Sequence, residues 1–257
     1  MIPGPDLLIT LAICLGIQAV FFVFAASLKT DKVTDLSYSL TFVIVAITLL
    51  MLSGATSNVS ALVVTAMVVA WGLRLASYLL TRILHMKRDA RFDGIREHFL
   101  PFLKFWFFQG VAVWVIMLPV TVWFRAPGAW SMLRSAGLLV WSVGLVIEAV
   151  ADQQKFNYKR TLGAKWTDVG LWRISRHPNY LGELMCWWGV FLFVLSDLSG
   201  SGVIVGLFGP LAISVVILFL TGVPQLEESA EKKWGGDPAY RQYVRTTGLI
   251  IPGIGKR

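Results

Sequence analysis

Hydrophobic residues in this chain form long runs that are separated by short polar segments. The runs have the length of a helix that crosses a lipid bilayer, which is about 17–25 residues. Seven of them stand out, at residues 5–27, 36–54, 60–82, 102–124, 131–151, 179–197 and 202–222. They leave little chain for a soluble domain. The sequence therefore predicts an all-α integral membrane protein, with seven transmembrane helices in a single membrane domain over residues 1–257.

Composition supports this class, and the placement of charge adds an orientation. Only 15% of the 257 residues are charged, whereas soluble domains carry about 25%. With the N-terminus outside, the cytoplasmic segments are 28–35, 83–101, 152–178 and 223–257, and Arg125 and Arg134 alone among the 23 Lys and Arg fall on the outer side. The positive-inside rule thus predicts an outside N-terminus and a cytoplasmic C-terminus. We attribute the net charge of +8 to orientation and to contact with membrane lipids, and expect no nucleic-acid partner.

Metal and disulfide chemistry find no support in the sequence. Cys14 and Cys186 both lie inside apolar runs, without the spacing of a disulfide framework or a zinc site. The three histidines are scattered, and nothing resembles the H-E-x-x-H motif of zinc proteases. We therefore expect no metal ion.

Polar side chains concentrate on the predicted cytoplasmic side. In the third run, Trp71, Arg74 and Tyr78 share one helical face, and Arg74 lies about 12 Å from the inner end at about 1.5 Å per residue. Its side chain either extends to the lipid headgroups or contacts a cavity or a ligand phosphate. At the end of the fifth run, Lys155 and Lys159 lie one helical turn apart on one face. Paired cations suit a phosphate, although a solvated helix end that fixes topology is the simpler alternative.

The segment 170–183, GLWRISRHPNYLGE, combines cations with a helix start. Pro178 fits the first turn of a helix, whose free N–H groups attract anions. Arg173, Arg176 and His177 stand just before that turn. The segment therefore predicts an anion site at the inner membrane face.

Asn179, Glu183 and Trp187 then follow as one stripe down the same helix. A carboxylate inside a membrane is costly and is usually functional. The alternative is structural, with Asn179 and Glu183 bonding a neighbouring helix. The C-terminal tail reads as an amphipathic helix, which either lies on the bilayer surface or closes a pocket with its tyrosines and with Glu227 and Glu228.

Several motifs resemble the membrane sterol reductases and steroid 5α-reductases and their bacterial relatives. They are GLWRISRHPNYLGE at 170–183 and EKKWGGDPAYRQYVRTTGLIIP at 231–252. The helix DQQKFNYK at 152–159 is similar to the Gln-Lys…Phe-Arg helix of sterol C14 reductases, and the 5α-reductases have Asn-Phe-Leu-Gly-Glu where this chain has Asn-Tyr-Leu-Gly-Glu at 179–183. The resemblance covers about residues 148–257; the first three runs are only loosely comparable.

By this resemblance, NADPH binds between the C-terminal spans and the cytoplasmic loops. The candidate cofactor-binding residues are Arg74, Asp152, Lys155, Lys159, Trp172, Arg173, Arg176, His177, Asn179, Glu227 and Tyr243. The implied reaction is NADPH-dependent reduction of a carbon–carbon double bond in a steroid- or sterol-like enone that enters from the bilayer. Hydride adds to the β-carbon, and the resulting enolate needs a hydrogen-bond donor at its oxygen.

Two candidate catalytic residues follow from that chemistry. Glu183, kept protonated by an apolar site, is suited to polarise the substrate carbonyl. In the 5α-reductases a tyrosine helps to hold the ketone, but the matching place here is Trp71, so we assign that role to Tyr38, with Tyr78 as the alternative. This departure bears on the identity of the substrate more than on the reductase chemistry.

Two other classes of function compete with the reductase. A membrane methyltransferase of the isoprenylcysteine or phospholipid type, dependent on S-adenosylmethionine, also has Arg-His-Pro-x-Tyr-x-Gly and a Glu-Glu pair. That cofactor carries no phosphates, so the basic clusters would be surplus. A transporter usually has inverted repeats and broken midplane helices, whereas the polar residues here crowd one side. We expect a monomer in a bacterial inner membrane or the endoplasmic reticulum, with its active site toward the cytoplasm.

Overall fold

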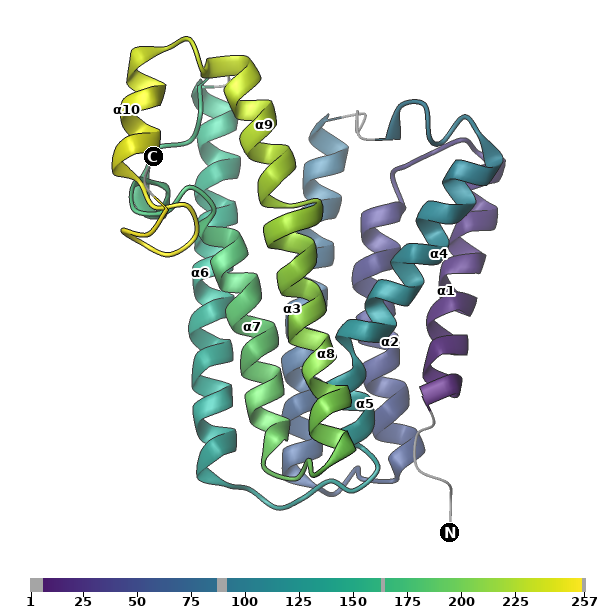
Figure 1. Cartoon of the computed structure of the whole chain (residues 1–257). Helices are drawn as coiled ribbons and strands as arrows, with labels where there is room; N and C mark the ends of the chain where they lie inside the picture. The colour runs from purple at the N-terminus through teal and green to yellow at the C-terminus, as the bar shows by residue number, and fades with distance from the viewer. Residues whose placement is uncertain (1–6, 87–91, 163–164, 256–257) are drawn as a thin grey trace. The chain divides into compact units, whose positions relative to one another are not determined.

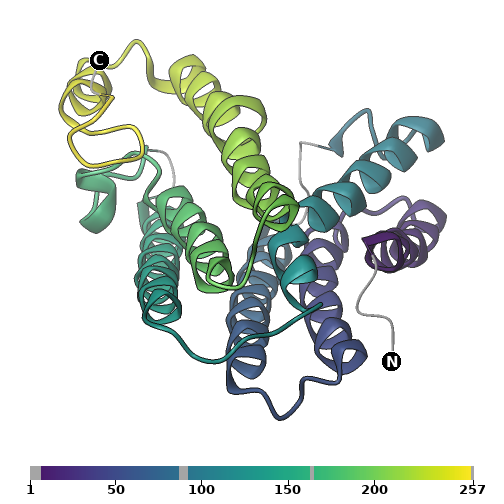
Figure 2. The same cartoon turned by 60° about the horizontal axis from the view of Figure 1, so that its bottom comes forward.

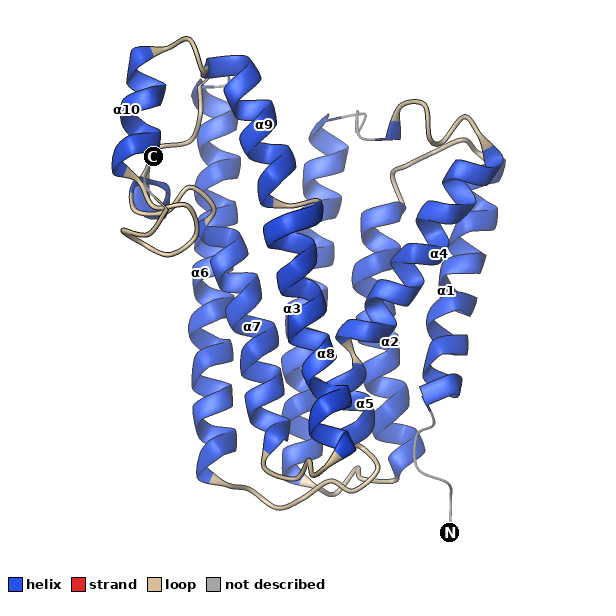
Figure 3. Cartoon of the chain, viewed as in Figure 1, coloured by secondary structure: helices blue, strands red, loops and turns tan. Residues whose placement is uncertain are grey.

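The computed structural model describes residues 7–86, 92–162 and 165–255, and within them every regular element is helical (Figures 1 and 3). This confirms the all-α class. The chain divides into two compact units. The first unit comprises Met1–Leu138 and Val190–Gly209, and the second comprises Leu139–Gly189 and Pro210–Arg257. Residues 87–91, 163–164 and 256–257, which belong to predicted cytoplasmic segments, lie outside the described part. The prediction of a single membrane domain stays a prediction.

Six helical segments in the described part of the chain are long and apolar enough to cross a membrane. They are Leu7–Ser27, Thr34–Ser53, Val59–Ile83, Phe99–Ile116, Met132–Thr161 and Ser201–Trp234. The protein is therefore a multi-pass integral membrane protein.

The predicted crossing at 179–197 is not among these six. A helix does form there, α7 (Pro178–Leu195), but its first turns contain Asn179 and Glu183. These polar residues lower its apolar character below that of the other spans. The count of seven thus exceeds the six that are observed, and the orientation of the helices stays a prediction.

The first unit is built on α1 (Leu7–Ser27), α2 (Thr34–Ser53), α3 (Val59–Met86) and α4 (Phe99–Ile116). Helix α1 packs against α2 and α4, and α2 packs against α3; these neighbours can be followed in Figures 1 and 2. Gly72 of α3 allows that helix to lie close to α2. A Cβ at this position would lie 2.8 Å from Val43 Cγ2 and 3.2 Å from the Ser39 carbonyl oxygen.

A buried amide network joins three of these helices. Gln18 Nε2 of α1 donates to Thr41 Oγ1 of α2 at 2.7 Å. Gln109 Nε2 of α4 donates to Gln18 Oε1 at 2.8 Å and to Ser37 Oγ at 3.1 Å. Where no water is at hand, buried polar groups must find partners on neighbouring helices. The network therefore fixes α1, α2 and α4 against one another.

The run predicted as one helix at 102–124 is two helices in the structure. Helix α4 starts earlier, at Phe99, and ends at Ile116, and α5 (Leu118–Trp123) follows after Met117. The physical reason is Pro119, which lacks an N–H and kinks or breaks a helix when it lies beyond the first turn. The helix therefore ends before the proline and restarts around it.

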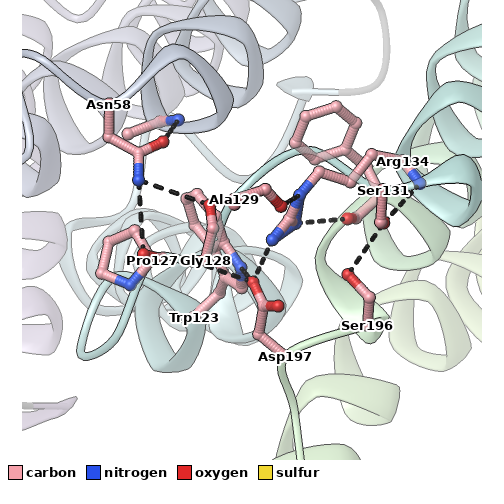
Figure 4. A network of polar contacts seen from close by, with 11 residues as sticks. Asn58, Trp123, Pro127, Gly128, Ala129, Ser131, Arg134, Ser196 and Asp197 are labelled. Carbon is pink, nitrogen blue, oxygen red and sulfur yellow. Dashed lines mark hydrogen bonds and ion pairs between the residues drawn. The ribbon is translucent and has the colours of Figure 1, made fainter.

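Asp197 and Arg134 form the centre of a polar network in the first unit (Figure 4). The Arg134 side chain is fully buried, makes an ion pair with Asp197, and donates from Nε to the Ala129 carbonyl oxygen at 2.9 Å. Asp197 Oδ2 also accepts from Trp123 Nε1 at 2.6 Å and from the Gly128 N–H at 3.0 Å. The sequence placed Arg134 on the predicted outer side of the membrane, and the structure shows that its side chain pairs with Asp197 inside the first unit.

Asn58 attaches the start of α3 to the loop that contains Pro127 and Gly128, and replacing it should lower the stability of the protein. Its Oδ1 accepts from the Ala61 N–H at 3.1 Å as a helix cap, and its Nδ2 donates to the carbonyl oxygens of Pro127 and Gly128 at 3.3 Å. We expect Asn58→Ala to lower the free energy of unfolding by about 1–2 kcal/mol. Thermal unfolding of the purified protein would measure this. Asn58→Asp keeps the cap and should lose only part of that energy; equal stability of all three proteins would contradict the assignment.

The second unit is organised by α6 (Met132–Leu162) and α7, which lie side by side (Figures 1 and 2). Their backbones meet at two glycines. A Cβ at Gly182 would lie 2.6 Å from the Gly144 carbonyl oxygen, and one at Gly144 would lie 2.7 Å from the Gly182 carbonyl oxygen. Small residues allow such close helix packing in membranes. Helix α6 continues well past residue 151, the predicted end of the fifth run.

The connection from α6 to α7 is bound to α6 through a 3-10 helix, Gly170–Arg173. Trp172 Nε1 donates to the Ala151 carbonyl oxygen at 2.9 Å, and the Leu171 N–H donates to Gln154 Oε1 at 2.9 Å. Gly170 has a φ of +53° and packs directly on Gln154, so no other residue fits its place well. This connection fixes the position of Arg176 and His177, which directly precede α7.

The last helices of the chain bring its C-terminal part to the start of α7. Helix α8 (Ser201–Val215) runs through a π-helix, Val216–Leu220, into α9 (Val223–Trp234). Helix α10 (Pro238–Thr246) follows and is capped by Asp237, whose Oδ1 accepts from the Ala239 N–H at 2.8 Å. Gly222 marks the break before α9, since a Cβ there would lie 2.6 Å from the Ile217 carbonyl oxygen.

Candidate functional site

The strongest polar cluster of the second unit lies at the start of α7. Arg176 Nη1 makes an ion pair with Glu227 Oε2, and His177 Nε2 lies 2.8 Å from Glu227 Oε1. The side chains of Arg176 and His177 are only 3% and 6% exposed. One carboxylate of α9 therefore holds both basic residues that precede α7. In the sequence, Glu227 lies 51 positions after Arg176 and 50 after His177.

Two atoms of this cluster are buried without a hydrogen-bond partner in the described part of the chain, Arg176 Nε and His177 Nδ1. Such atoms are uncommon in folded proteins because each one costs about 1–3 kcal/mol. Since His177 Nε2 faces a carboxylate, it carries the proton of the neutral ring, which leaves Nδ1 as an acceptor. The cluster thus offers one guanidinium donor and one imidazole acceptor to a ligand, beside the helix N-terminus that favours anions.

Burial lowers the pKa of His177, even though the Glu227 carboxylate opposes the shift; Lys155 and Arg176 add to it. The folded protein therefore holds this imidazole neutral. Protonation is easier in the unfolded chain, so the free energy of unfolding should fall as the pH drops below the usual histidine pKa of about 6.5, by at most about 1.4 kcal/mol per pH unit.

Unfolding of the wild-type protein and of His177→Gln between neutral and mildly acidic pH tests this. The difference between the two proteins isolates His177 from the other histidines. We expect the variant to lose less stability on acidification; parallel pH profiles would contradict the neutral, buried imidazole.

The two predicted lysines of α6 lie over indole rings. Lys155 Nζ is 4.8 Å from the ring centre of Trp172, and Lys159 Nζ is 5.1 Å from that of Trp234. Lys159 also donates to the Lys165 carbonyl oxygen at 2.5 Å. Asp152 is buried on the same helix. These cations are held in place by aromatic rings, an arrangement that can receive a phosphate-bearing ligand with stacked bases.

An aromatic cluster completes this side of the second unit. The ring of Trp166 lies 5.2 Å from that of Tyr240 and 6.2 Å from that of Trp234. Tyr243 donates from its hydroxyl to the Trp172 carbonyl oxygen at 2.8 Å, and burial raises its pKa, so it stays a neutral donor. Trp166 Nε1 is buried and has no hydrogen-bond partner among the residues that the structure describes. Sequence reasoning missed Trp166, whose only signal is a tryptophan in a polar connecting segment.

Further down α7, Asn179 and Glu183 are both partly buried and Trp187 is buried. The neighbouring Gly182 touches α6 at Glu148, a second buried carboxylate. The site therefore has two carboxylates along the contact of α6 and α7. Sequence reasoning did not select Glu148.

The remaining candidates are placed as follows. Arg173 is exposed and donates from Nε to the Asp168 carbonyl oxygen at 3.1 Å. Tyr38 and Arg74 belong to the first unit; the ring of Tyr38 packs edge-on to Phe42 at 5.1 Å, and the Arg74 guanidinium lies 5.8 Å from the ring of Tyr78. Among the described residues, no three His, Cys, Asp or Glu side chains form a group that could hold a metal ion.

Comparison with known proteins identifies a family whose function is unknown. The family described as "Protein of unknown function (DUF1295)" matches residues 21–247. The uncharacterized protein C594.04c of Schizosaccharomyces pombe is 27% identical over 150 residues, which cover 50% of this chain and 40% of that protein. The chain thus matches about two fifths of the length of this relative. No solved structure matches. Since the family match covers most of the chain, the protein belongs to the DUF1295 family and is a multi-pass membrane protein within it.

Proposed function

We propose that the second unit binds NADPH and that the protein reduces a carbon–carbon double bond in a steroid- or sterol-like enone. The observation that carries the proposal is the pair of buried, unpartnered atoms at the start of α7, Arg176 Nε and His177 Nδ1. They stand at a helix N-terminus in a unit that also holds Lys155 and Lys159 over indole rings. A ligand that satisfies them needs an anionic group and a hydroxyl donor, and a phosphorylated ribose has both.

The residues of the second unit fit such a dinucleotide. NADPH carries three phosphates, and Arg176, Lys155 and Lys159 supply three cations. His177 Nδ1 would accept from a ribose hydroxyl. The proposed contacts extend to the other candidate residues of this unit, namely Asp152, Trp172, Arg173, Asn179, Glu227 and Tyr243. Bound there, the cofactor supplies a hydride.

The protein's own part in the reaction is to polarise the substrate. Glu183, in its protonated form, donates a hydrogen bond to the carbonyl oxygen of the enone. The assignment of Tyr38 to the ketone stays a prediction from the sequence. Negative charge gathers on that oxygen when hydride reaches the β-carbon, so a fixed donor stabilises the transition state more than the ground state. A proton taken up from water at the α-carbon then completes the reduction.

The proposed function also requires an orientation. We place the C-terminus and the cofactor site on the cytoplasmic side, where reduced nicotinamide is made, with α7 as a seventh crossing and the protein as a monomer. The excess of Lys and Arg in the corresponding segments supports this orientation. The apolar substrate would enter from the bilayer.

Turnover of Glu183→Gln tests the catalytic assignment. NADPH oxidation is followed with the full chain in lipid nanodiscs and a panel of 3-oxo-Δ4-steroids. We expect Glu183→Gln to lower kcat about a hundredfold with little change in NADPH binding, whereas Glu228→Gln, an exposed glutamate that pairs with Lys232, should keep full activity. Full turnover by Glu183→Gln with any accepted enone contradicts the role of Glu183.

A further inference from the structure

The 3-10 helix before α7 lies level with the end of the apolar part of α6. That helix is predominantly apolar from Met132 to Ala151, after which Asp152 begins its polar end. The apolar part is about 29 Å long at about 1.5 Å per residue, which matches the roughly 30 Å core of a bilayer. Trp172 donates to the Ala151 carbonyl oxygen. Residues next to Trp172 therefore lie where the hydrocarbon core meets the lipid headgroups.

The C-terminal loop, residues 248–255, is fixed at this same level. Ser175 and Gly248 form a parallel β-bridge, in which the Arg176 N–H donates to the Gly248 carbonyl oxygen at 2.8 Å. Ser175 Oγ donates to the Ile250 carbonyl oxygen at 2.7 Å. Figure 1 shows this end of the chain, in yellow, lying beside the start of α7 in the second unit.

This loop and the adjoining segment before α7 expose three large apolar side chains. Ile174, Ile251 and Ile254 are 52%, 51% and 63% exposed, and we call them the isoleucine patch. By contrast, Ile250 of the same loop is buried. Leaving three isoleucines in water is unfavourable by about 25 cal/mol for each Å² of apolar surface. Arg173 is exposed next to Ile174 and makes no ion pair within the described residues.

We propose that the isoleucine patch inserts into the bilayer surface and anchors the C-terminal loop to the membrane. Two independent features select a bilayer as the partner. The patch lies at the depth where α6 leaves the hydrocarbon core, and Arg173 stands beside it at the level of the lipid phosphates. Apolar side chains bordered by cations are the usual composition of interfacial membrane anchors. The anchor holds the loop that also contacts Arg176, and it stands whether or not the protein is a reductase.

The test places a fluorophore at single positions of the full chain. Ile251→Cys and Ile254→Cys are labelled with an environment-sensitive maleimide dye, while the natural Cys14 and Cys186 are buried and react poorly. Gly236→Cys is the matched control, because this residue is exposed and a Cβ there meets no atom within 4 Å. The proteins are reconstituted into phosphatidylcholine–phosphatidylglycerol nanodiscs, with a lipid-borne nitroxide or dissolved iodide as quencher.

We expect the nitroxide to quench the dye at Ile251 and Ile254 about threefold more strongly than at Gly236, with the opposite order for iodide. Iodide quenching at the isoleucine sites that equals the quenching at Gly236 overturns the proposal. Disulfide-linked dimers of unlabelled Ile254→Cys, formed in place of nitroxide quenching, overturn it as well, because they assign the patch to a second copy of the chain.

Discussion

Replacing Arg176 by alanine should weaken NADPH binding by about a thousandfold, or about 4 kcal/mol. The side chain is buried, it pairs with Glu227, and its Nε has no hydrogen-bond partner among the described residues. Truncation removes the proposed phosphate ligand and leaves the Glu227 carboxylate pointing toward the cofactor. Loss of a charge-assisted bond and gain of a repulsive charge act in the same direction. Calorimetric titration of the full chain in nanodiscs measures the change.

Two further variants separate this effect from misfolding. Arg176→Lys keeps the charge but loses Nε and the planar guanidinium. This variant should fold, and its affinity for NADPH should be at least tenfold lower than that of the wild type. Arg245→Ala removes an exposed cation of α10 and should bind as the wild type does. An Arg176→Ala protein that folds and binds NADPH with unchanged affinity would contradict the site.

Replacing Gly182 by alanine should destabilise the second unit by about 3 kcal/mol. The added Cβ would lie 2.6 Å from both the Glu148 nitrogen and the Gly144 carbonyl oxygen. Both are backbone atoms of α6, which cannot move aside as a flexible side chain does. The two helices must therefore separate, and the start of α7 shifts with them. Thermal unfolding in detergent, followed by near-ultraviolet circular dichroism, measures the loss.

Gly16→Ala is the matched control for this substitution. Gly16 also lies inside an apolar helix, α1, but a Cβ there meets no atom within 4 Å. Alanine is the better helix former, so this change should be neutral or slightly stabilising. Equal melting temperatures for the two glycine variants would show that the contact of α6 with α7 is looser than described.

The sequence was sufficient for most of the helical framework. Apolar runs of membrane length placed the helices. A segment that crosses lipid must hydrogen-bond its own backbone, which favours a helix, and it needs about 20 apolar residues to span the bilayer. The interruption at Pro119 was readable in principle, since proline ends or restarts a helix. The apolar run ended at residue 151, but the helical spacing of Lys155 and Lys159 already indicated a helix beyond it, and α6 does extend to Leu162.

The pairing of distant residues was beyond sequence reasoning. Nothing local indicates that Arg134 meets Asp197, or that Glu227 holds both Arg176 and His177. Each pair is created by the packing of helices that are separated in the chain, and a charged residue looks the same in sequence whether it orients a membrane segment or ties two helices. Periodicity did place Lys155 and Lys159 on one face, but it did not reveal the indole rings beneath them.

The central claim is that the second unit is a dinucleotide site, and ligand binding to the purified protein tests it most directly. The full chain in nanodiscs is titrated with NADPH, NADH and S-adenosylmethionine in turn. We expect NADPH to bind, and its binding to be weakened in both Lys159→Ala and Arg176→Ala. Binding of S-adenosylmethionine without NADPH would contradict it and would assign the protein to the membrane methyltransferases.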